Sequence, residues 1–250
     1  MTSPELVMED VRLDRGALPV LRGVSLRAAP GEVVALVGPS GCGKSTVLDL
    51  LAGLLRPDGG RVRTDGREAH AAVGHAALMP QSDSLMPWRT LLGNVAVGGR
   101  LAGLPDREAD ARARALLDRF GLAGFAEHYP HALSGGMRQR AALARTVLAA
   151  RGAWLLDEPF GALDALTRAD LRQELLRAWG PTPPTVVLVT HDAEEAALLA
   201  DRVLVCGARP MGQLIEVPLP TPRPRVEADV RDARGAVLDA LAAARGRVPA

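Results

Sequence analysis

The stretch "EVVALVGPSGCGKST", Glu32 to Thr46, is the part of this chain that says most about its fold. Its first half is a short continuous apolar run, which is typical of a strand buried on both faces of a sheet. Its second half carries the spacing Gly-x-x-x-x-Gly-Lys-Ser, and the apolar residues after Lys44 recur at helical spacing. A buried strand, a glycine-rich turn and a helix in this order predict a phosphate-binding loop.

Each residue type in this loop has a physical reason. Glycines let the backbone fold tightly enough for consecutive N–H groups to face phosphate oxygens, and the following helix adds its unpaired N–H groups. Lys44 is the only lysine of the chain, so it stands where a compact ammonium serves and a planar guanidinium does not fit. Ser45 can ligate Mg²⁺ through its hydroxyl. The residues expected to bind the nucleotide here are Gly38, Pro39, Ser40, Gly41, Cys42, Gly43, Lys44, Ser45 and Thr46.

Composition narrows the class of protein. The chain has 250 residues, 48% of them hydrophobic and 24% charged, which suits one large globular domain or a domain with a subdomain. A net charge of +1 and 3% aromatic residues argue against a nucleic-acid partner. Two cysteines fit a reducing cytosol. No signal peptide and no run of roughly 18 apolar residues is present. We therefore expect a soluble protein, so that any membrane role would come through a partner.

Strands and helices alternate along most of the chain. The strands are expected at 5–13, 24–28, 32–38, 60–66, 71–81, 153–159, 185–192 and 201–207. The helices are expected at 44–54, 90–103, 106–122, 136–150, 166–179 and 193–200. This alternation predicts an α/β fold, a mostly parallel sheet with helices on both faces and one helical insertion. A proline-rich segment, 217–225, is expected to be extended, and a terminal helix that simply packs is expected after it.

A pair of carboxylates follows a second apolar run, "AWLL" before Asp157 and Glu158. This strand should lie beside the phosphate loop, which places Asp157 near the Mg²⁺ site at the end of the sheet. Glu158 then stands where a carboxylate can accept a proton from an attacking water. The alternative is a strand followed by a solvated acidic turn. After a phosphate loop we favour the catalytic interpretation.

The segment "LSGGMRQR" begins another helix. Ser134 is a natural N-cap, and Gly135 and Gly136 open a long amphipathic helix. Because its first N–H groups lack partners in the helix, this end is a second potential phosphate site. The alternative is an ordinary capped helix after a turn.

With these motifs in one order, the chain from about residue 6 to 225 resembles the nucleotide-binding subunit of ATP-binding cassette (ABC) transporters. The resemblance rests on the phosphate loop 38–46, Gln81 in "LMPQ", "LSGGM", "LLDE", Asp164 in "ALD" and His191 in "VTHD". It implies a RecA-like P-loop NTPase core with an N-terminal antiparallel β subdomain. The cassette would span residues 1–225, with a helical subdomain inserted at about 82–135 and a C-terminal helix or tail over 226–250.

The resemblance also implies a mechanism with ATP and Mg²⁺. Two copies would close head to tail around two ATP molecules, so that Ser134 and Gly136, with Gly135 between them, meet the γ-phosphate held by the other copy's Lys44. Asp164 would link the two sites across the dimer.

Three further roles follow from the same likeness. Glu158 would be the general base, and Gln81 would sense the metal ion and the attacking water. His191 would hold the γ-phosphate and the water in register. For His191 the alternative is a surface histidine at a strand end, and for Gln81 it is a plain polar residue. Mg²⁺ would be held by Ser45, Gln81 and Asp157.

One residue departs from the family pattern. ABC proteins usually carry an aromatic residue that stacks on adenine, and Arg15 occupies that place here. Its guanidinium plane can stack on a base. A solvent-facing arginine beside a less base-selective site is the alternative.

The insertion resembles importers of the nitrate, sulfonate and taurine type, which also include importers of thiamine precursors, through "PWRTLLGNVAVG". Trp88 could anchor in a membrane subunit, or it could pack the small core of the insertion. The partners implied are a second copy, two transmembrane permease subunits and, indirectly, an extracytoplasmic solute-binding protein, with the chain on the cytoplasmic side of the membrane. The alternatives are a soluble ABC ATPase of DNA repair or translation, a phosphoryl-transfer kinase and an exporter. The kinase would lack "LSGGM" and the "VTHD" histidine.

Overall fold

Strand β3 (Val33–Val37) is the apolar run that precedes the phosphate loop. In the computed structural model it lies inside a six-stranded sheet, with every side chain buried. The side chains alternate between two hydrophobic cores, with Val34 and Leu36 in one core and the other three in the second. A strand that faces a core on both sides has no polar position, which explains the continuous apolar sequence.

The structure describes residues 3–72, 74–180, 184–219, 225 and 227–245. The six strands follow the order β10-β9-β3-β8-β7-β6. All neighbouring pairs are parallel except β10 with β9. Their bounds are β6 (Ala76–Met79), β7 (Ala153–Asp157), β8 (Thr185–Thr190), β9 (Arg202–Val205) and β10 (Ile215–Pro218). The parallel strands end at one edge, where the loops that follow β3 and β7 meet.

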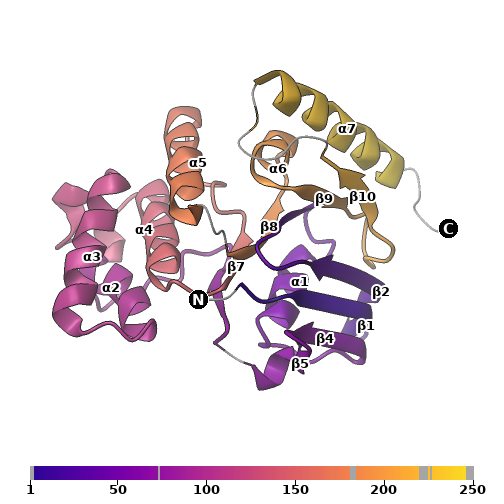
Figure 1. Cartoon of the computed structure of the whole chain (residues 1–250), viewed down its shortest axis with the longest axis horizontal. Helices are drawn as coiled ribbons and strands as arrows, with labels where there is room; N and C mark the ends of the chain where they lie inside the picture. The colour runs from indigo at the N-terminus through magenta and orange to yellow at the C-terminus, as the bar shows by residue number, and fades with distance from the viewer. Residues whose placement is uncertain (1–2, 73, 181–183, 220–224, 226, 246–250) are drawn as a thin grey trace.

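A second, antiparallel sheet covers the side of the phosphate-loop helix that faces away from the central sheet (Figure 1). Its strand order is β2-β1-β4-β5. The bounds are β1 (Leu6–Arg15), β2 (Leu18–Ala28), β4 (Gly59–Thr64) and β5 (Arg67–Glu68). This sheet and the central sheet enclose helix α1 (Lys44–Leu51) in a common core.

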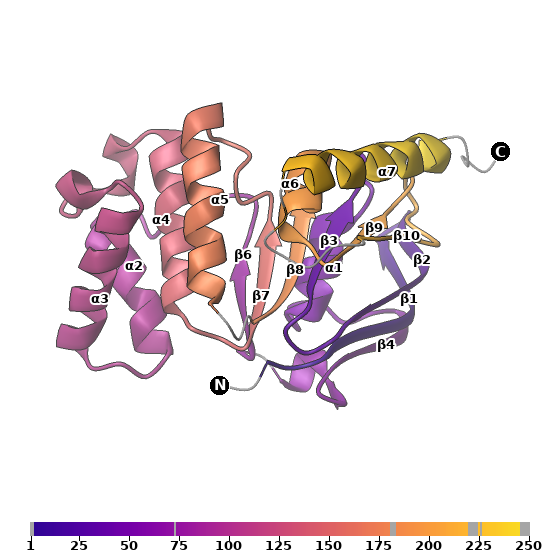
Figure 2. The same cartoon turned by 45° about the horizontal axis from the view of Figure 1, so that its top comes forward.

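Helices α2, α3, α4 and α5 gather at the opposite end of the molecule from this second sheet (Figures 1 and 2). α2 and α3 pack against α4, and Gly98 of α2 lies so close to α4 that an added Cβ would be 2.2 Å from the carbonyl oxygen of Arg145. The bounds are α2 (Leu91–Leu101), α3 (Asp106–Arg119), α4 (Gly135–Leu148), α5 (Ala165–Trp179) and α6 (Ala193–Leu199). Three short 3₁₀ turns are η1 (Ala69–Ala71), η2 (Ala123–Phe125) and η3 (Pro130–Ala132).

The predicted fold class is confirmed: a mostly parallel sheet, an antiparallel N-terminal sheet and inserted helices are all present. The strand expected at 71–81 is shorter, because residues 69–71 form a 3₁₀ turn and β6 begins only at Ala76. The domain boundaries at 82, 135 and 225 stay predictions. Helix α4 packs with α2 and α3 although it begins only at Gly135.

The C-terminal part confirms two expectations within the described residues. The start of the segment expected to be extended, Val217 and Pro218, belongs to β10, while 220–224 lie outside the described residues. Helix α7 (Glu227–Arg245) packs over α6, β9 and β10 through Val237 (Figure 2). Among the described helices, none has both the length and the apolar character needed to cross a bilayer.

Gly38 stands where the phosphate loop leaves β3, and its neighbours exclude a side chain. A Cβ at this position would lie 2.2 Å from the Sγ of Cys206 and 2.7 Å from its carbonyl oxygen. We expect Gly38→Ala to lower the free energy of unfolding by about 1–3 kcal/mol, the usual cost of overpacking. Urea unfolding measures this value. Gly124→Ala, where a Cβ meets open space, is the matched control, and equal effects of the two substitutions would contradict the prediction.

Candidate active site

A cavity of about 380 Å³ lies over the phosphate loop, at the carboxyl ends of β3 and β7. Ten of the residues predicted for the site line it: Arg15, Ser40, Gly41, Gly43, Lys44, Ser45, Thr46, Gln81, Asp157 and Glu158. Four further lining residues were not predicted from the sequence: Leu18, Val20, Asp49 and Arg209. The structure thus brings together residues from five separate parts of the chain.

The backbone of the loop is shaped by two glycines. Gly41 and Gly43 have φ angles of 76° and 118°, which are accessible to glycine with little strain. Gly43 is the N-cap of α1, and no side chain caps this helix. The first N–H groups of α1 thus have no side-chain cap, and such unpaired groups at a helix N-terminus suit anion binding.

Lys44 is held by the loop that it belongs to. Its Nζ donates to the carbonyl oxygens of Gly38 and Pro39, both at 2.8 Å, and the residue is only 6% exposed. Gly38 and Pro39 themselves do not line the cavity; their carbonyls hold the ammonium. The result is one positive charge at a set position beside the loop's N–H groups.

Cys42 faces the protein interior. Its Sγ lies 3.1 Å from the Sγ of Cys206 at the end of β9, and both thiols are buried. The hydrogen bond with Cys206 and the nearby charge of Lys44 lower the pKa of the Cys42 thiol to about 7, against the opposing effect of burial. The side chain thus packs the loop onto the sheet.

Asp157 and Ser45 meet at the base of the cavity. Burial raises the pKa of Asp157, while a hydrogen bond with Ser45 and the charge of Lys44 act in the opposite direction. Carboxylate, hydroxyl and amide oxygens are the hard ligands that suit Mg²⁺, and Gln81 lines the same cavity. Within the described residues no group of three or more His, Cys, Asp or Glu side chains forms a metal cage. Mg²⁺ needs no such cage, because it is usually held by few protein ligands together with phosphate oxygens.

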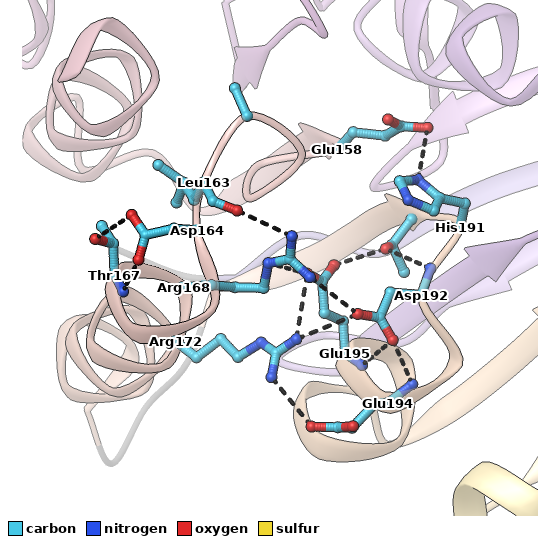
Figure 3. A network of polar contacts seen from close by, with 12 residues as sticks. Glu158, Leu163, Asp164, Thr167, Arg168, Arg172, His191, Asp192, Glu194 and Glu195 are labelled. Atoms are coloured by element: carbon cyan, nitrogen blue, oxygen red, sulfur yellow. Dashed lines mark hydrogen bonds and ion pairs between the residues drawn. The ribbon is translucent and has the colours of Figure 1, made fainter. Parts of the chain in front are cut away.

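Glu158 occupies an unusual backbone conformation beside His191. Its φ is 47°, and its N–H donates to the carbonyl of Val189 at 2.9 Å. Its Oε1 lies 3.3 Å from the Nδ1 of His191, on the turn between β8 and α6 (Figure 3). A non-glycine residue keeps a positive φ only where its surroundings hold it. The carboxylate lines the cavity, whereas the histidine that it contacts does not.

Gln139 is a positioning residue that the sequence did not reveal. It is buried on α4, its Nε2 donates to the carbonyl of Glu158 at 2.6 Å, and its Oε1 accepts from the N–H of Ala162 at 2.7 Å. The signal that could have found it is a glutamine at a core-facing position of an amphipathic helix. These bonds help hold the strained main chain at Glu158.

We expect Gln139→Leu to lower the free energy of unfolding by about 3 kcal/mol, since each buried polar group left unpaired costs about 1–3 kcal/mol. We also expect kcat for ATP to fall about tenfold, or about 1.4 kcal/mol in the barrier. Denaturant unfolding and steady-state kinetics test both effects. Gln173→Leu, an exposed position on α5, is the control. A variant with unchanged kcat would remove Gln139 from the support of Glu158.

The remaining predicted residues lie outside this cavity. Ser134 is the N-cap of α4 and accepts from the N–H of Met137 at 3.2 Å; Gly135 and Gly136 follow it. Asp164 is the N-cap of α5, and its contacts with Thr167 lower its pKa. None of these four predicted residues lines the cavity around Lys44. Within one chain, therefore, the two helix ends predicted to bind phosphate do not share one cavity.

Of two open alternatives, the one for Arg15 stays open and the one for Trp88 has a structural outcome. Arg15 lines the cavity with its Nη2 3.5 Å from the Oδ2 of Asp49, a position compatible with stacking on a base or with solvent exposure. Trp88 is 74% exposed. The interpretation that Trp88 packs the core of the inserted helices is therefore wrong.

A phosphate loop, oxygen groups at Ser45 and Asp157 that suit Mg²⁺, and a carboxylate beside a histidine are together the features of a P-loop ATPase. Comparisons with known proteins specify the family. Residues 21–161 match the family model described as ABC transporter. The chain is 42% identical over 198 residues to the taurine import ATP-binding protein TauB of Yersinia pestis, covering 79% of this chain and 77% of that protein. It is 44% identical over 218 residues to the nitrate import ATP-binding protein NrtC of Synechococcus elongatus, covering 85% of this chain but only 33% of that protein.

Solved structures agree. The ATP-binding cassette MJ0796, a dimer bound to ADP and Pi, matches with a TM-score of 0.77 and 29% identity, covering 86% of this chain and 99% of that chain. The chain belongs to the ABC transporter family, and it is an ATP-binding, ATP-hydrolysing subunit of that family.

Proposed function

We propose that this chain energises an importer of a small solute by hydrolysing MgATP between two copies of itself. The observation that carries the proposal is the separation within one chain: the cavity holds Lys44 and Glu158, whereas the helix end at Ser134 lies elsewhere. A second copy placed head to tail would bring its Ser134, Gly135 and Gly136 to the phosphates over Lys44. Asp164 would then lie at the contact between the two copies.

The chemistry follows from the residues at the cavity. The N–H groups of the loop and the ammonium of Lys44 bind the phosphates. Ser45, Asp157 and Gln81 would hold Mg²⁺, which neutralises phosphate charge when bound. Glu158 accepts the proton of the attacking water, and its contact with His191 keeps the carboxylate and that water in register.

The solute proposed is a small solute of the nitrate, sulfonate or taurine type. The support is the identity with the taurine and nitrate import proteins over most of this chain. The exposed Trp88 would dock on one of two permease subunits at the cytoplasmic side of the membrane, and an extracytoplasmic solute-binding protein would deliver the solute. A thiamine precursor is the second candidate solute.

Deletion of the gene in its host tests this proposal. We expect uptake of one radiolabelled solute among taurine, alkanesulfonates, nitrate and thiamine precursors to be lost. A plasmid copy should restore it, and a Lys44→Ala copy should not. Unchanged uptake of all four, with ATP hydrolysis by the purified chain, would instead favour a soluble ABC ATPase.

A further inference from the structure

His191 has an exposed side chain held by its neighbours. The imidazole is 62% exposed and contacts Glu158, while the residues on either side are anchored (Figure 3). The hydroxyl of Thr190 donates to the Oε2 of Glu195 at 2.6 Å and accepts the N–H of Asp192 at 3.0 Å. The position of the histidine is thus set through Thr190 and Asp192.

Glu195 is the centre of this arrangement. It is only 4% exposed, and burial raises the pKa of its carboxyl, while Thr190 and Arg172 act in the opposite direction. The Nη2 of Arg172, a buried side chain of α5, lies 3.3 Å from the Oε1 of Glu195 and 3.4 Å from the Oδ2 of Asp192. A buried ion pair is rarely more stabilising than apolar side chains of the same size. Stability alone therefore does not explain why Arg172 and Glu195 form a buried ion pair here.

Arg168 connects this cluster to the loop before α5. Its Nη2 donates to the carbonyl oxygen of Leu163 at 3.0 Å, and its Nη1 lies 3.5 Å from the Oδ2 of Asp192 (Figure 3). Leu163 directly precedes Asp164, the N-cap of α5. One guanidinium thus spans from the loop that carries Asp164 to the turn that carries His191.

We propose that Arg168 and Arg172 of α5 are positioning residues, which set His191 against Glu158 through Asp192 and Glu195. The inference rests on the proposed function, in which His191 and Glu158 act on the attacking water. In the proposed dimer, the loop that ends at Asp164 meets the second copy. Arg168 therefore links the loop that would meet the second copy to the turn that carries His191.

Kinetics of ATP hydrolysis test the proposal first. We expect Arg168→Ala to lower kcat about tenfold with KM for ATP within about twofold, which is the pattern of a group that acts in the transition state. Arg168→Lys keeps one charged contact and should recover part of the rate. Arg177→Ala is the matched control, because Arg177 lies on the same helix and pairs with Glu174, away from His191. An Arg168→Ala kcat within twofold of the parent would overturn the proposal.

The imidazole signals of His191 in NMR supply a readout that does not depend on turnover. The chain has five histidines, so His191→Gln assigns the signals by subtraction. We expect them to move toward those of a free histidine in Arg168→Ala and to stay in place in Arg177→Ala. A reduced kcat with unmoved His191 signals would also overturn the proposal. If Arg168→Ala does not fold, Asp192→Asn, which keeps the N-cap oxygen and removes the charge, is measured in the same two ways.

The two levels of inference fail separately. A parent chain that does not hydrolyse ATP would contradict the proposed function, while the NMR comparison would still show whether α5 sets the histidine. A parent that hydrolyses ATP, with no effect of Arg168→Ala, would leave the proposed function standing and overturn the positioning role alone.

Discussion

Replacing Lys44 by arginine lowers kcat for ATP hydrolysis at least a hundredfold, although the positive charge is kept. The ammonium lies between the carbonyl oxygens of Gly38 and Pro39, both at 2.8 Å, inside a loop packed against Cys206. A planar guanidinium is larger and cannot take that place without opening the loop. A hundredfold loss corresponds to about 2.7 kcal/mol of lost transition-state stabilisation. Steady-state kinetics and nucleotide titration calorimetry separate the effects on turnover and on binding.

The control exchanges the same two residue types in the opposite direction on the surface. Arg231→Lys on α7 alters an exposed arginine that pairs with Glu227 at 3.8 Å. We expect its kinetics to match those of the parent. A Lys44→Arg protein that hydrolyses ATP at the parent rate would falsify the role given to Lys44.

Replacing Glu158 by glutamine has the second large effect: ATP still binds, but hydrolysis falls about a thousandfold. The carboxamide has nearly the same shape as the carboxylate but cannot accept a proton, and a general base contributes about 10²–10⁴-fold. Because ATP is no longer consumed, the closed pair of copies should persist. Light scattering after gel filtration, with and without MgATP, should show a shift from monomer to dimer.

The matched control is Glu127→Gln, which removes an exposed carboxylate that pairs with Arg114 on the inserted helices. It should hydrolyse ATP at the parent rate and show no lasting dimer. A Glu158→Gln protein that stays monomeric with ATP bound would mean that closure needs the membrane subunits. A variant with normal turnover would move the general base to another residue.

The elements nearest the phosphates follow closely from the order of residues. Strands β3 and β7 are continuous apolar runs because both faces of the central sheet are covered, and sequence periodicity reports such burial directly. The turn after β3 needs glycine for its backbone angles, and α1 begins at the next residue. Local rules of this kind were sufficient to predict the phosphate loop.

The residues that hold Glu158 and His191 could not be predicted in the same way. Gln139, on α4, donates to the carbonyl oxygen of Glu158, which follows β7. Arg172, on α5, forms an ion pair with Glu195 on α6. In the sequence, an arginine or glutamine on an amphipathic helix is the common pattern of a solvated face. When these side chains are buried, they contact Glu158 and the turn of His191 and help hold them in place. Whether they are buried depends on which helices pack together.

The amino-acid order thus sets the local chemistry: a glycine-rich turn after a buried strand, a lone lysine, paired carboxylates and capped helices. Backbone angles, helix caps and the apolar pattern of buried strands depend on residues a few positions away. These features can therefore be predicted from the sequence alone. Three other features could be seen only in the folded chain: Cys42 packs on Cys206, Trp88 is exposed, and α5 contacts the turn of His191 through Arg172 and Asp192. Those outcomes depend on contacts between segments far apart in the chain, and such contacts arise only when the sheets and helices pack.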